Sequence, residues 1–169
     1  MKIQIMGFSG SGKSTLAKKL GDYYNIPYLH LDNIKFYGDW QERTAEEQNQ
    51  LVKKFLAEHE SWVIDGNHTD VAPERFLQTD ITILLIFNRF YCYYKCWKRY
   101  KENVGKDRES CPCEERFEAD FKKWILYEGR TRAIKKELIN ELNKTKGEKH
   151  IFRNRRQLKK WLATRGIDY

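Results

Sequence analysis

The sequence predicts an α/β fold in which a parallel sheet is covered by helices on both faces. Short apolar runs alternate with longer helical patterns along the 169 residues, and this alternation is typical of parallel sheets. The run at 81–87 (ITILLIF) is apolar almost throughout, as expected of a strand buried on both sides. A glycine-rich stretch separates the first run from the first helical pattern. The length favours a single domain over residues 1–169.

Five strands and five helices are expected in order along the chain. The strands are expected at 2–6, 27–31, 62–64, 81–87 and 149–152. The helices are expected at 13–24, 44–59, 91–102, 114–143 and 155–164, with Gly129 as the position where the fourth could break. Thr44 and Glu47 open the second helix as a capping box, and its apolar residues recur on one face. The stretch 103–113 is polar, contains Gly and Pro, and is expected to be a loop.

Residues 7–14 read GFSGSGKS and match a phosphate-binding loop, Gly-x4-Gly-Lys-Ser, in the required strand–loop–helix setting. Glycines let backbone N–H groups turn inward around a phosphate, and the N-terminus of the next helix adds its positive dipole end. We expect Lys13 to reach the β- and γ-phosphates of ATP and Ser14 to bind Mg²⁺. The predicted contacts to the nucleotide from this stretch are Gly7, Ser9, Gly10, Ser11, Gly12, Lys13, Ser14 and Thr15.

Two aspartates follow expected strands and should lie at the same edge of the sheet, where open α/β folds bind ligands. Asp65 ends an apolar run, as a Walker B aspartate does, and we assign it to the Mg²⁺ shell. We assign Asp32 to the acceptor side, as a general base. The acceptor is expected to bind near Asp32, Asp65 and His68. The alternatives are a turn or helix-cap role for each aspartate and a turn role for the histidine.

Three segments together resemble adenylate-kinase-related proteins known as DNA topology modulation proteins (FlaR-like). They are the glycine-rich stretch, HLD at 30–32 and WVIDGN at 62–67, and the similarity extends over the whole chain to FRNRRQLKKWL at 152–162. The resemblance implies a three-layer α/β/α P-loop NTPase fold of the nucleotide-kinase type, with a five-stranded parallel sheet of order 2-3-1-4-5, a helical lid and ATP binding. True adenylate kinases have an aromatic residue, Pro and Arg after the Asp-Gly, where this chain has Asn67, His68 and Thr69, so AMP is not the expected acceptor.

Nucleotide kinases close a lid whose arginines meet the charge on the transferred phosphoryl group. The segment 98–120 is the expected lid, and Arg99 and Arg108 are its expected catalytic arginines, flanked by Arg89 and Arg116. The alternative is ordinary solvated charge. After the last strand, Asn154 and Arg155 are expected beside the base of the nucleotide, or else they open a helix without touching a ligand.

Two further groups of side chains have competing interpretations. The aromatics Phe36, Tyr37 and Trp40 follow Asp32 and either cover the acceptor pocket or pack against the core. The four cysteines are Cys92, Cys96, Cys111 and Cys113. Their spacing is unlike the CxxC pairs of zinc sites, so we expect thiols, as in a cytoplasmic protein.

The charge is unevenly distributed. The chain carries a formal net charge of +8, but residues 1–84 have 9 Lys and Arg against 12 Asp and Glu, whereas residues 85–169 have 23 against 12. The basic half could attract polyanions. No run of 18 apolar residues and no signal peptide is present, which favours a cytoplasmic protein with no membrane partner that is a monomer or a weak dimer.

The sequence therefore predicts an ATP- and Mg²⁺-dependent kinase-like enzyme that transfers the γ-phosphoryl group to a small acceptor, either a nucleoside, a nucleotide or a metabolite. The alternative is an ATP-dependent nucleic-acid-binding regulator that affects DNA topology. The sequence has no helix-turn-helix, zinc finger or other element that would read a groove of DNA, so the kinase is favoured. An ATP-binding protein without turnover is the third possibility.

Overall fold

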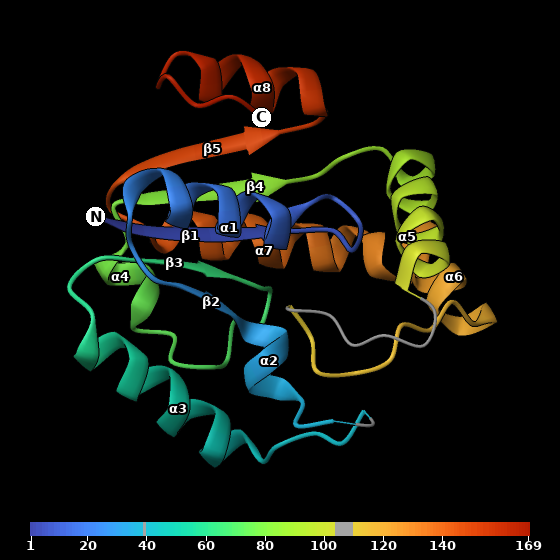
Figure 1. Ribbon diagram of the computed structural model, residues 1–169, viewed down its shortest axis with the longest axis horizontal. Coiled ribbons are helices and arrows are strands. Elements are labelled where there is room, and N and C mark those ends of the chain that lie inside the picture. Colours follow the sequence, from blue (N-terminus) through green and yellow to red (C-terminus); the bar gives the residue numbers. More distant parts are fainter. Residues whose placement is uncertain (39, 104–109) are drawn as a thin grey trace.

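The computed structural model describes residues 1–38, 40–103 and 110–169 (Figure 1). Within them, one parallel sheet has the strand order β2-β3-β1-β4-β5, which confirms the predicted 2-3-1-4-5 arrangement. The strands are β1 (Lys2–Gly7), β2 (Tyr28–His30), β3 (Trp62–Asp65), β4 (Ile81–Leu85) and β5 (Glu148–Phe152). Helices lie on both sides of this sheet: in Figure 1, α1 (Lys13–Tyr24) is in front of it and α7 (Arg132–Lys144) is behind it.

The remaining helices surround the sheet and its edges. They are α2 (Leu31–Lys35), α3 (Ala45–Glu58), α4 (Arg75–Gln78), α5 (Arg89–Asn103), α6 (Ala119–Leu126), the short 3₁₀ helix η1 (Glu128–Arg130) and α8 (Arg155–Ala163). In Figure 1, α2 and α3 lie beyond the β2 edge, α8 lies beyond the β5 edge, and α5 and α6 lie at the end where β1 and β4 finish. No helix among the described residues has the length and apolar character needed to span a membrane.

The register of the sheet brings the ends of three strands together. Asp65 of β3 is the partner of Ile5 on β1 and of His30 on β2. On the other side of β1, Gly7 is the partner of Leu85. The residues that end β2 and β3 therefore lie next to the beginning of the phosphate-binding loop, as expected for a parallel sheet.

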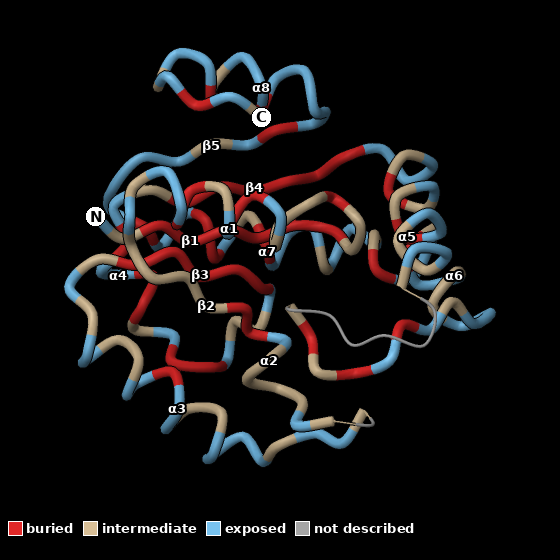
Figure 2. The backbone as a smooth tube through the Cα atoms, in the orientation of Figure 1, coloured by how far each residue is buried: buried red, intermediate tan, exposed pale blue. Residues whose placement is uncertain are grey.

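The core follows the central strands, which are buried along most of their length (Figure 2). Its main cluster joins β1, β4, α1 and α8 through fully buried residues such as Ile5, Leu16, Leu84 and Leu158. A smaller cluster around Trp62 and Val52 attaches α3 and α2 to the β3 side. Burial of these apolar side chains fixes the strands, so that the loops at their ends start from rigid positions.

Several expected boundaries were wrong. The long helix predicted at 114–143 is two helices, α6 and α7, separated by η1, and 114–118 is not helical. The break falls at Gly129, as expected. A side chain there would meet the indole of Trp124 at 2.8 Å, so the close contact requires glycine. Thr131 then starts α7 by accepting a hydrogen bond from the Ile134 amide at 3.3 Å. The short helices α2 and α4 were not predicted from the sequence. Strand β4 ends two residues earlier than expected.

Candidate functional site

The phosphate-binding loop connects β1 to α1 and lines a cleft of about 620 Å³. Gly12 precedes α1 with φ of 93°, and no side chain caps the helix there, so the first amides of α1 have no side-chain partner at that end. Gly10, with φ of 75°, passes directly over α5. A Cβ at Gly10 would lie 2.4 Å from the carbonyl oxygen of Cys92 and 2.7 Å from Sγ of Cys96. The loop can therefore lie this close to α5 only because residue 10 is glycine.

The residues predicted to contact the nucleotide lie around this loop. Six of them line the cleft: Ser9, Gly10, Gly12, Lys13, Ser14 and Thr15. Lys13 Nζ donates to the carbonyl oxygens of Gly7 at 3.1 Å and Phe8 at 3.3 Å, which keeps its ammonium group against the loop. Ser11 is buried and lines a neighbouring pocket instead.

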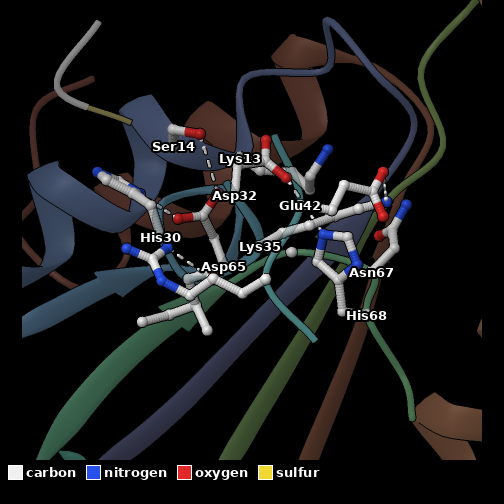
Figure 3. A network of polar contacts seen from close by, with 12 residues as sticks. Lys13, Ser14, His30, Asp32, Lys35, Glu42, Asp65, Asn67 and His68 are labelled. Carbon is white, nitrogen blue, oxygen red and sulfur yellow. Dashed lines mark hydrogen bonds and ion pairs between the residues drawn. The ribbon is translucent and has the colours of Figure 1, made fainter. Parts of the chain in front are cut away.

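Ser14, Asp65 and His30 form a connected group beside the loop (Figure 3). Ser14 Oγ donates to Asp65 Oδ2 at 2.9 Å, and His30 Nδ1 bonds the other carboxylate oxygen of Asp65. Asp65 and His30 are both buried. The hydroxyl and carboxylate oxygens are ligands that suit Mg²⁺, which is usually held by one or two carboxylates together with substrate phosphates. His30, interpreted from the sequence as structural only, is thus a direct partner of a predicted site residue.

Two hydrogen bonds of Asn67 connect the start of the loop to the segment after β3. Asn67 Oδ1 accepts from the Gly7 amide at 2.9 Å, and Asn67 Nδ2 donates to the Gly7 carbonyl oxygen at 2.9 Å. The primary amide satisfies both backbone groups of one residue, so the start of the loop is fixed to the segment after β3. The sequence analysis assigned no role to this side chain.

Asp32 and His68 meet at the other side of the cleft. His68 Nε2 donates to Asp32 Oδ1 at 3.2 Å, and both side chains line the cleft. Asp32 does not directly end a strand as expected, because it lies in the first turn of α2. Arg43 holds that short helix in place: its Nη1 donates to the carbonyl oxygens of Asn33, Ile34 and Phe36 at 2.7 to 3.0 Å.

The position of His68 depends on a buried arginine. Arg75 of α4 is fully buried and donates to the carbonyl oxygens of His68 at 2.8 Å and Ala72 at 3.2 Å, and also to that of Val71. Its Nε donates to Gln4 Oε1 at 3.0 Å. Burial lowers the pKa of the Arg75 guanidinium to about 10, which still leaves it charged at neutral pH. The sequence analysis missed this residue, since nothing in its local pattern distinguishes it from a surface arginine.

The predicted lid is described in part. Arg99 lines the cleft, and its Nη2 donates to Oε1 of the buried Glu115 at 2.9 Å. Arg116 also lines the cleft, whereas Arg89 stacks on Tyr127. Arg108, the other expected catalytic arginine, lies outside the described residues, so its role stays a prediction. The cleft also contains residues to which the sequence analysis gave no role: Lys35, Glu115, Glu118, Asp120 and Phe121.

The two residues expected beside the base have different roles. Asn154 Oδ1 accepts from the Gln157 amide at 2.9 Å and so caps α8. Arg155 lines a second pocket of about 460 Å³ that also includes Gly12 and Thr15 of the loop. There its guanidinium lies 5.4 Å from the ring centroid of Tyr169, and burial raises the pKa of that tyrosine.

All four cysteines are buried thiols. Burial raises the pKa of Cys92 and of Cys96, so both stay protonated near neutral pH and are weak nucleophiles. In the part of the chain that the structure describes, no three His, Cys, Asp or Glu side chains are grouped as a metal site would need.

Comparisons with known proteins identify the fold. No family model and no curated protein matches the chain. Shikimate kinase from Bacteroides thetaiotaomicron aligns over 96% of this chain and 98% of its own, with 17% identity and a TM-score of 0.56. An uncharacterized protein from Eubacterium ventriosum aligns over 90% of this chain and 87% of its own, with 16% identity and a TM-score of 0.51. The protein TT1252 from Thermus thermophilus aligns over 97% of each chain, with 17% identity and a TM-score of 0.51. The chain therefore has the fold of P-loop kinase-like proteins.

Proposed function

We propose that the chain is an ATP-dependent phosphotransferase that transfers the γ-phosphoryl group to a hydroxyl of a small acceptor. One observation carries the proposal: the phosphate-binding loop and the Asp32–His68 pair line the same cleft. A phosphate donor on the loop and an acceptor beside Asp32 could therefore meet there. The resemblance to adenylate-kinase-related topology modulation proteins agrees with this proposal. We also propose a cytoplasmic location, where ATP and reduced thiols occur together.

The described residues supply charge and position. Lys13 would neutralise the β- and γ-phosphates, and Ser14 with Asp65 would hold Mg²⁺, which would supply further positive charge to the phosphates. The guanidinium group of Arg99, together with the predicted Arg108, meets the charge on the transferred group. Such sites gain most of their rate from positioning and electrostatics.

The transfer itself needs one proton acceptor. The acceptor oxygen bonds to the γ-phosphorus while the bond from that phosphorus to the bridging oxygen of ADP breaks. The proton of the acceptor hydroxyl passes to the Asp32 carboxylate, which His68 orients through its hydrogen bond.

The test is ADP release from ATP and Mg²⁺ with a panel of nucleosides, nucleotides and small hydroxylated metabolites. We expect one class of acceptor to raise turnover far above the rate with water. Lys13→Ala should reduce that turnover at least 100-fold, whereas Lys53→Ala, which changes an exposed lysine on α3, should leave it unchanged. A chain that binds ATP but gives no acceptor-dependent ADP contradicts the proposal.

The role of Asp32 can be tested separately. Asp32→Asn keeps the size of the side chain but removes the proton acceptor, so transfer should fall at least 100-fold. ATP affinity, measured by titration with a fluorescent ATP analogue, should change less than threefold. Loss of ATP binding would instead place Asp32 on the nucleotide side.

An ATP-dependent nucleic-acid-binding regulator is the second candidate, and one surface favours it. Phe90, Tyr94 and Trp97 are exposed on α5, and Lys101 lies 4.3 Å from the Trp97 ring centroid. Exposed aromatics beside cations are suited to stacking single-stranded bases. The candidate predicts oligonucleotide binding that weakens steeply with salt and persists in Lys13→Ala. Fluorescence anisotropy with a labelled oligonucleotide measures both.

A further inference from the structure

We propose that Tyr169 selects the base of the phosphate donor: its ring stacks on a purine, and its hydroxyl lies beside the phosphate-binding loop. This inference rests on the proposed function, in which a nucleoside triphosphate binds to that loop, and it adds the residue that distinguishes one base from another. It is drawn from the second pocket, the one that Arg155 and Tyr169 line together.

The cleft and the second pocket meet at the phosphate-binding loop. Gly12 and Thr15 line both of them. In the proposed reaction the γ-phosphate end of the donor points toward Asp32 and His68, so the nucleoside end has to leave the loop elsewhere. The second pocket begins at the same two loop residues, has a volume of about 460 Å³ and includes neither Asp32 nor His68 in its lining. It is therefore the place we assign to the nucleoside.

Three aromatic side chains line the second pocket. They are Phe87, Tyr91 and Tyr169, and the rings of Phe87 and Tyr91 pack edge-on with their centroids 5.7 Å apart. Tyr169 is partly buried against the main cluster of the core. Its hydroxyl oxygen lies close to the loop, since a Cβ at Gly12 would be only 3.3 Å from it. Tyr169 thus reaches from the core to the loop, and a nucleoside that continues from the loop into this pocket would contact it.

The position of the Tyr169 ring is fixed by its neighbours. Two residues earlier, the buried Ile167 anchors the chain, and its amide donates to the Leu162 carbonyl oxygen of α8 at 3.0 Å. The guanidinium of Arg155, at the start of α8, lies 5.4 Å from the Tyr169 ring centroid, a distance at which a cation attracts an aromatic ring. A ring that is already held in place loses little freedom when a ligand stacks on it.

Ser11 provides an independent indication of a ligand in this pocket. It is buried and lines the pocket, and its Oγ has no hydrogen-bond partner among the described residues. Buried hydroxyl groups without a partner are uncommon in proteins. Burial also raises the pKa of the Tyr169 phenol, so this hydroxyl keeps its proton near neutral pH and can donate. The ribose and α-phosphate oxygens of a nucleotide are suitable partners for both hydroxyl groups.

The preference for a purine follows from the area of the stacked rings. Every base has a π-face that can stack on an aromatic side chain. The two fused rings of a purine cover more of a tyrosine ring than the single ring of a pyrimidine does, and the free energy gained on burial grows with that area. The phosphate-binding loop contributes nothing to this selection, because it contacts the part that all nucleoside triphosphates share.

The experiment compares five donors with the same triphosphate: ATP, GTP, CTP, UTP and ribose 5-triphosphate. Binding of each to the full chain is measured calorimetrically with Mg²⁺ present. We expect at least one purine nucleotide to bind at least fivefold more tightly than CTP and UTP, and at least tenfold more tightly than ribose 5-triphosphate. The ATP and GTP measurements show which purine is preferred. Equal affinity for all four nucleotides, or equal affinity for ATP, GTP and ribose 5-triphosphate, overturns the proposal.

Two variants test whether Tyr169 is the cause of the preference. Tyr169→Leu keeps apolar bulk against the core but removes the aromatic face, so the purine preference should fall below twofold. Tyr169→Phe keeps the face and should retain the preference, while the loss of the hydroxyl weakens binding of every donor about threefold. Tyr127→Leu changes an exposed tyrosine that lines neither pocket, and it should leave all affinities unchanged.

The ratio of affinities separates base recognition from a structural role. If Tyr169 only supported the fold, Tyr169→Leu would weaken binding of all five donors equally, and the unchanged preference would contradict the proposal. The outcomes also separate this proposal from the proposed function. A purine preference that depends on Tyr169, without acceptor-dependent ADP release, means that only the phosphotransferase proposal fails. Acceptor-dependent transfer that is equally fast with all four nucleotides, each binding equally well, means that only the role of Tyr169 fails.

Discussion

Asp65 is buried, and each of its carboxylate oxygens has one partner, Ser14 on one side and His30 on the other. His30→Ala removes the second partner and leaves a buried oxygen without a hydrogen bond, which typically costs about 1–3 kcal/mol. Urea unfolding should show a loss of this size, and the Mg²⁺ concentration needed for ADP release should rise. His59→Ala is the comparison: it removes the contact of the His59 ring with the Phe55 carbonyl oxygen at the end of α3, away from Asp65, and should leave the Mg²⁺ requirement unchanged. A loss below about 0.5 kcal/mol would show that Asp65 does not depend on this contact.

Gly10 tests how closely the phosphate-binding loop must approach α5. Gly10→Ala places a Cβ against the Cys92 carbonyl oxygen and Cys96 Sγ at a φ of 75°. We expect about 2–4 kcal/mol of destabilisation, the sum of a left-handed alanine and an overpacked contact. Gly166→Ala has nearly the same φ, 73°, but meets only the end of the Tyr23 side chain at 3.2 Å. Thermal unfolding should therefore separate the two variants, and equal losses would mean that backbone conformation alone matters.

The candidate site could be predicted from the sequence only where a local motif fixes the geometry. The spacing of Gly12, Lys13 and Ser14 is such a motif, and an aspartate at the end of an apolar run is a weaker one. Arg75 and Asn67 act through backbone carbonyls and amides that become their neighbours only when β1, β3 and α4 assemble. No spacing along the chain encodes such contacts, so these residues could not be found without the structure.

Helix α3 provides a prediction about pH. The hydrogen bonds from the Thr44 amide and hydroxyl to Glu47, both 2.8 Å, lower the pKa of Glu47. A carboxyl whose pKa is lower in the folded chain stabilises the fold above its ordinary pKa of about 4.5 and loses that contribution as the pH falls through the folded value. Glu47→Gln should therefore lower Tm at pH 7, and the difference from the original chain should shrink as the pH falls below 4.5 and Glu47 becomes protonated in the folded chain.

The control for this measurement lies on the same helix. Glu46 is also in the first turn of α3, but it makes no hydrogen bond to the N-cap residue. Glu46→Gln tests the interaction with the helix dipole, which is worth a few tenths of a kcal/mol at an exposed position, together with an exposed hydrogen bond from Gln50 Nε2 at 3.1 Å. A pH dependence of equal size in both variants would assign the effect to the dipole rather than to the capping box.

Element boundaries were predictable where the sequence carries its own start signal. The capping box of Thr44 and Glu47 placed α3 within one residue. The break between α6 and α7 was placed at Gly129 from the sequence, but the short helix η1 and the contact of Gly129 with the Trp124 ring were not foreseen. Helix α2 has five residues, too few for a periodic pattern, and Arg43 stabilises it from outside the helix.

The topology as a whole was predictable because it combines two kinds of information. Alternation of strands and helices indicates a parallel sheet with both faces covered, and the resemblance supplied the strand order that the structure confirms. The opposite wall of the cleft was not predictable in this way. It brings α2 and the nearby Trp40 together with the start of α6, which is far from them in the sequence and meets them only in the folded chain.

Because the phosphate-binding loop connects the central strand to α1 and contacts α5, a ligand on it should stabilise the entire fold. A ligand that binds only the folded chain adds about 2.7 kcal/mol when its concentration is 100 times its Kd. For a chain of this size, that corresponds to a rise in Tm of roughly 5–10 °C.

ATP with Mg²⁺ should produce this shift in Tm, whereas ribose triphosphate should produce part of it if Arg155 and Tyr169 contact the base. Lys13→Ala should abolish most of the shift without greatly changing the Tm of the free chain, since Lys13 Nζ contacts only loop carbonyls. A full shift in Lys13→Ala would mean that ATP binds elsewhere, and the assignment of the cleft would then be wrong.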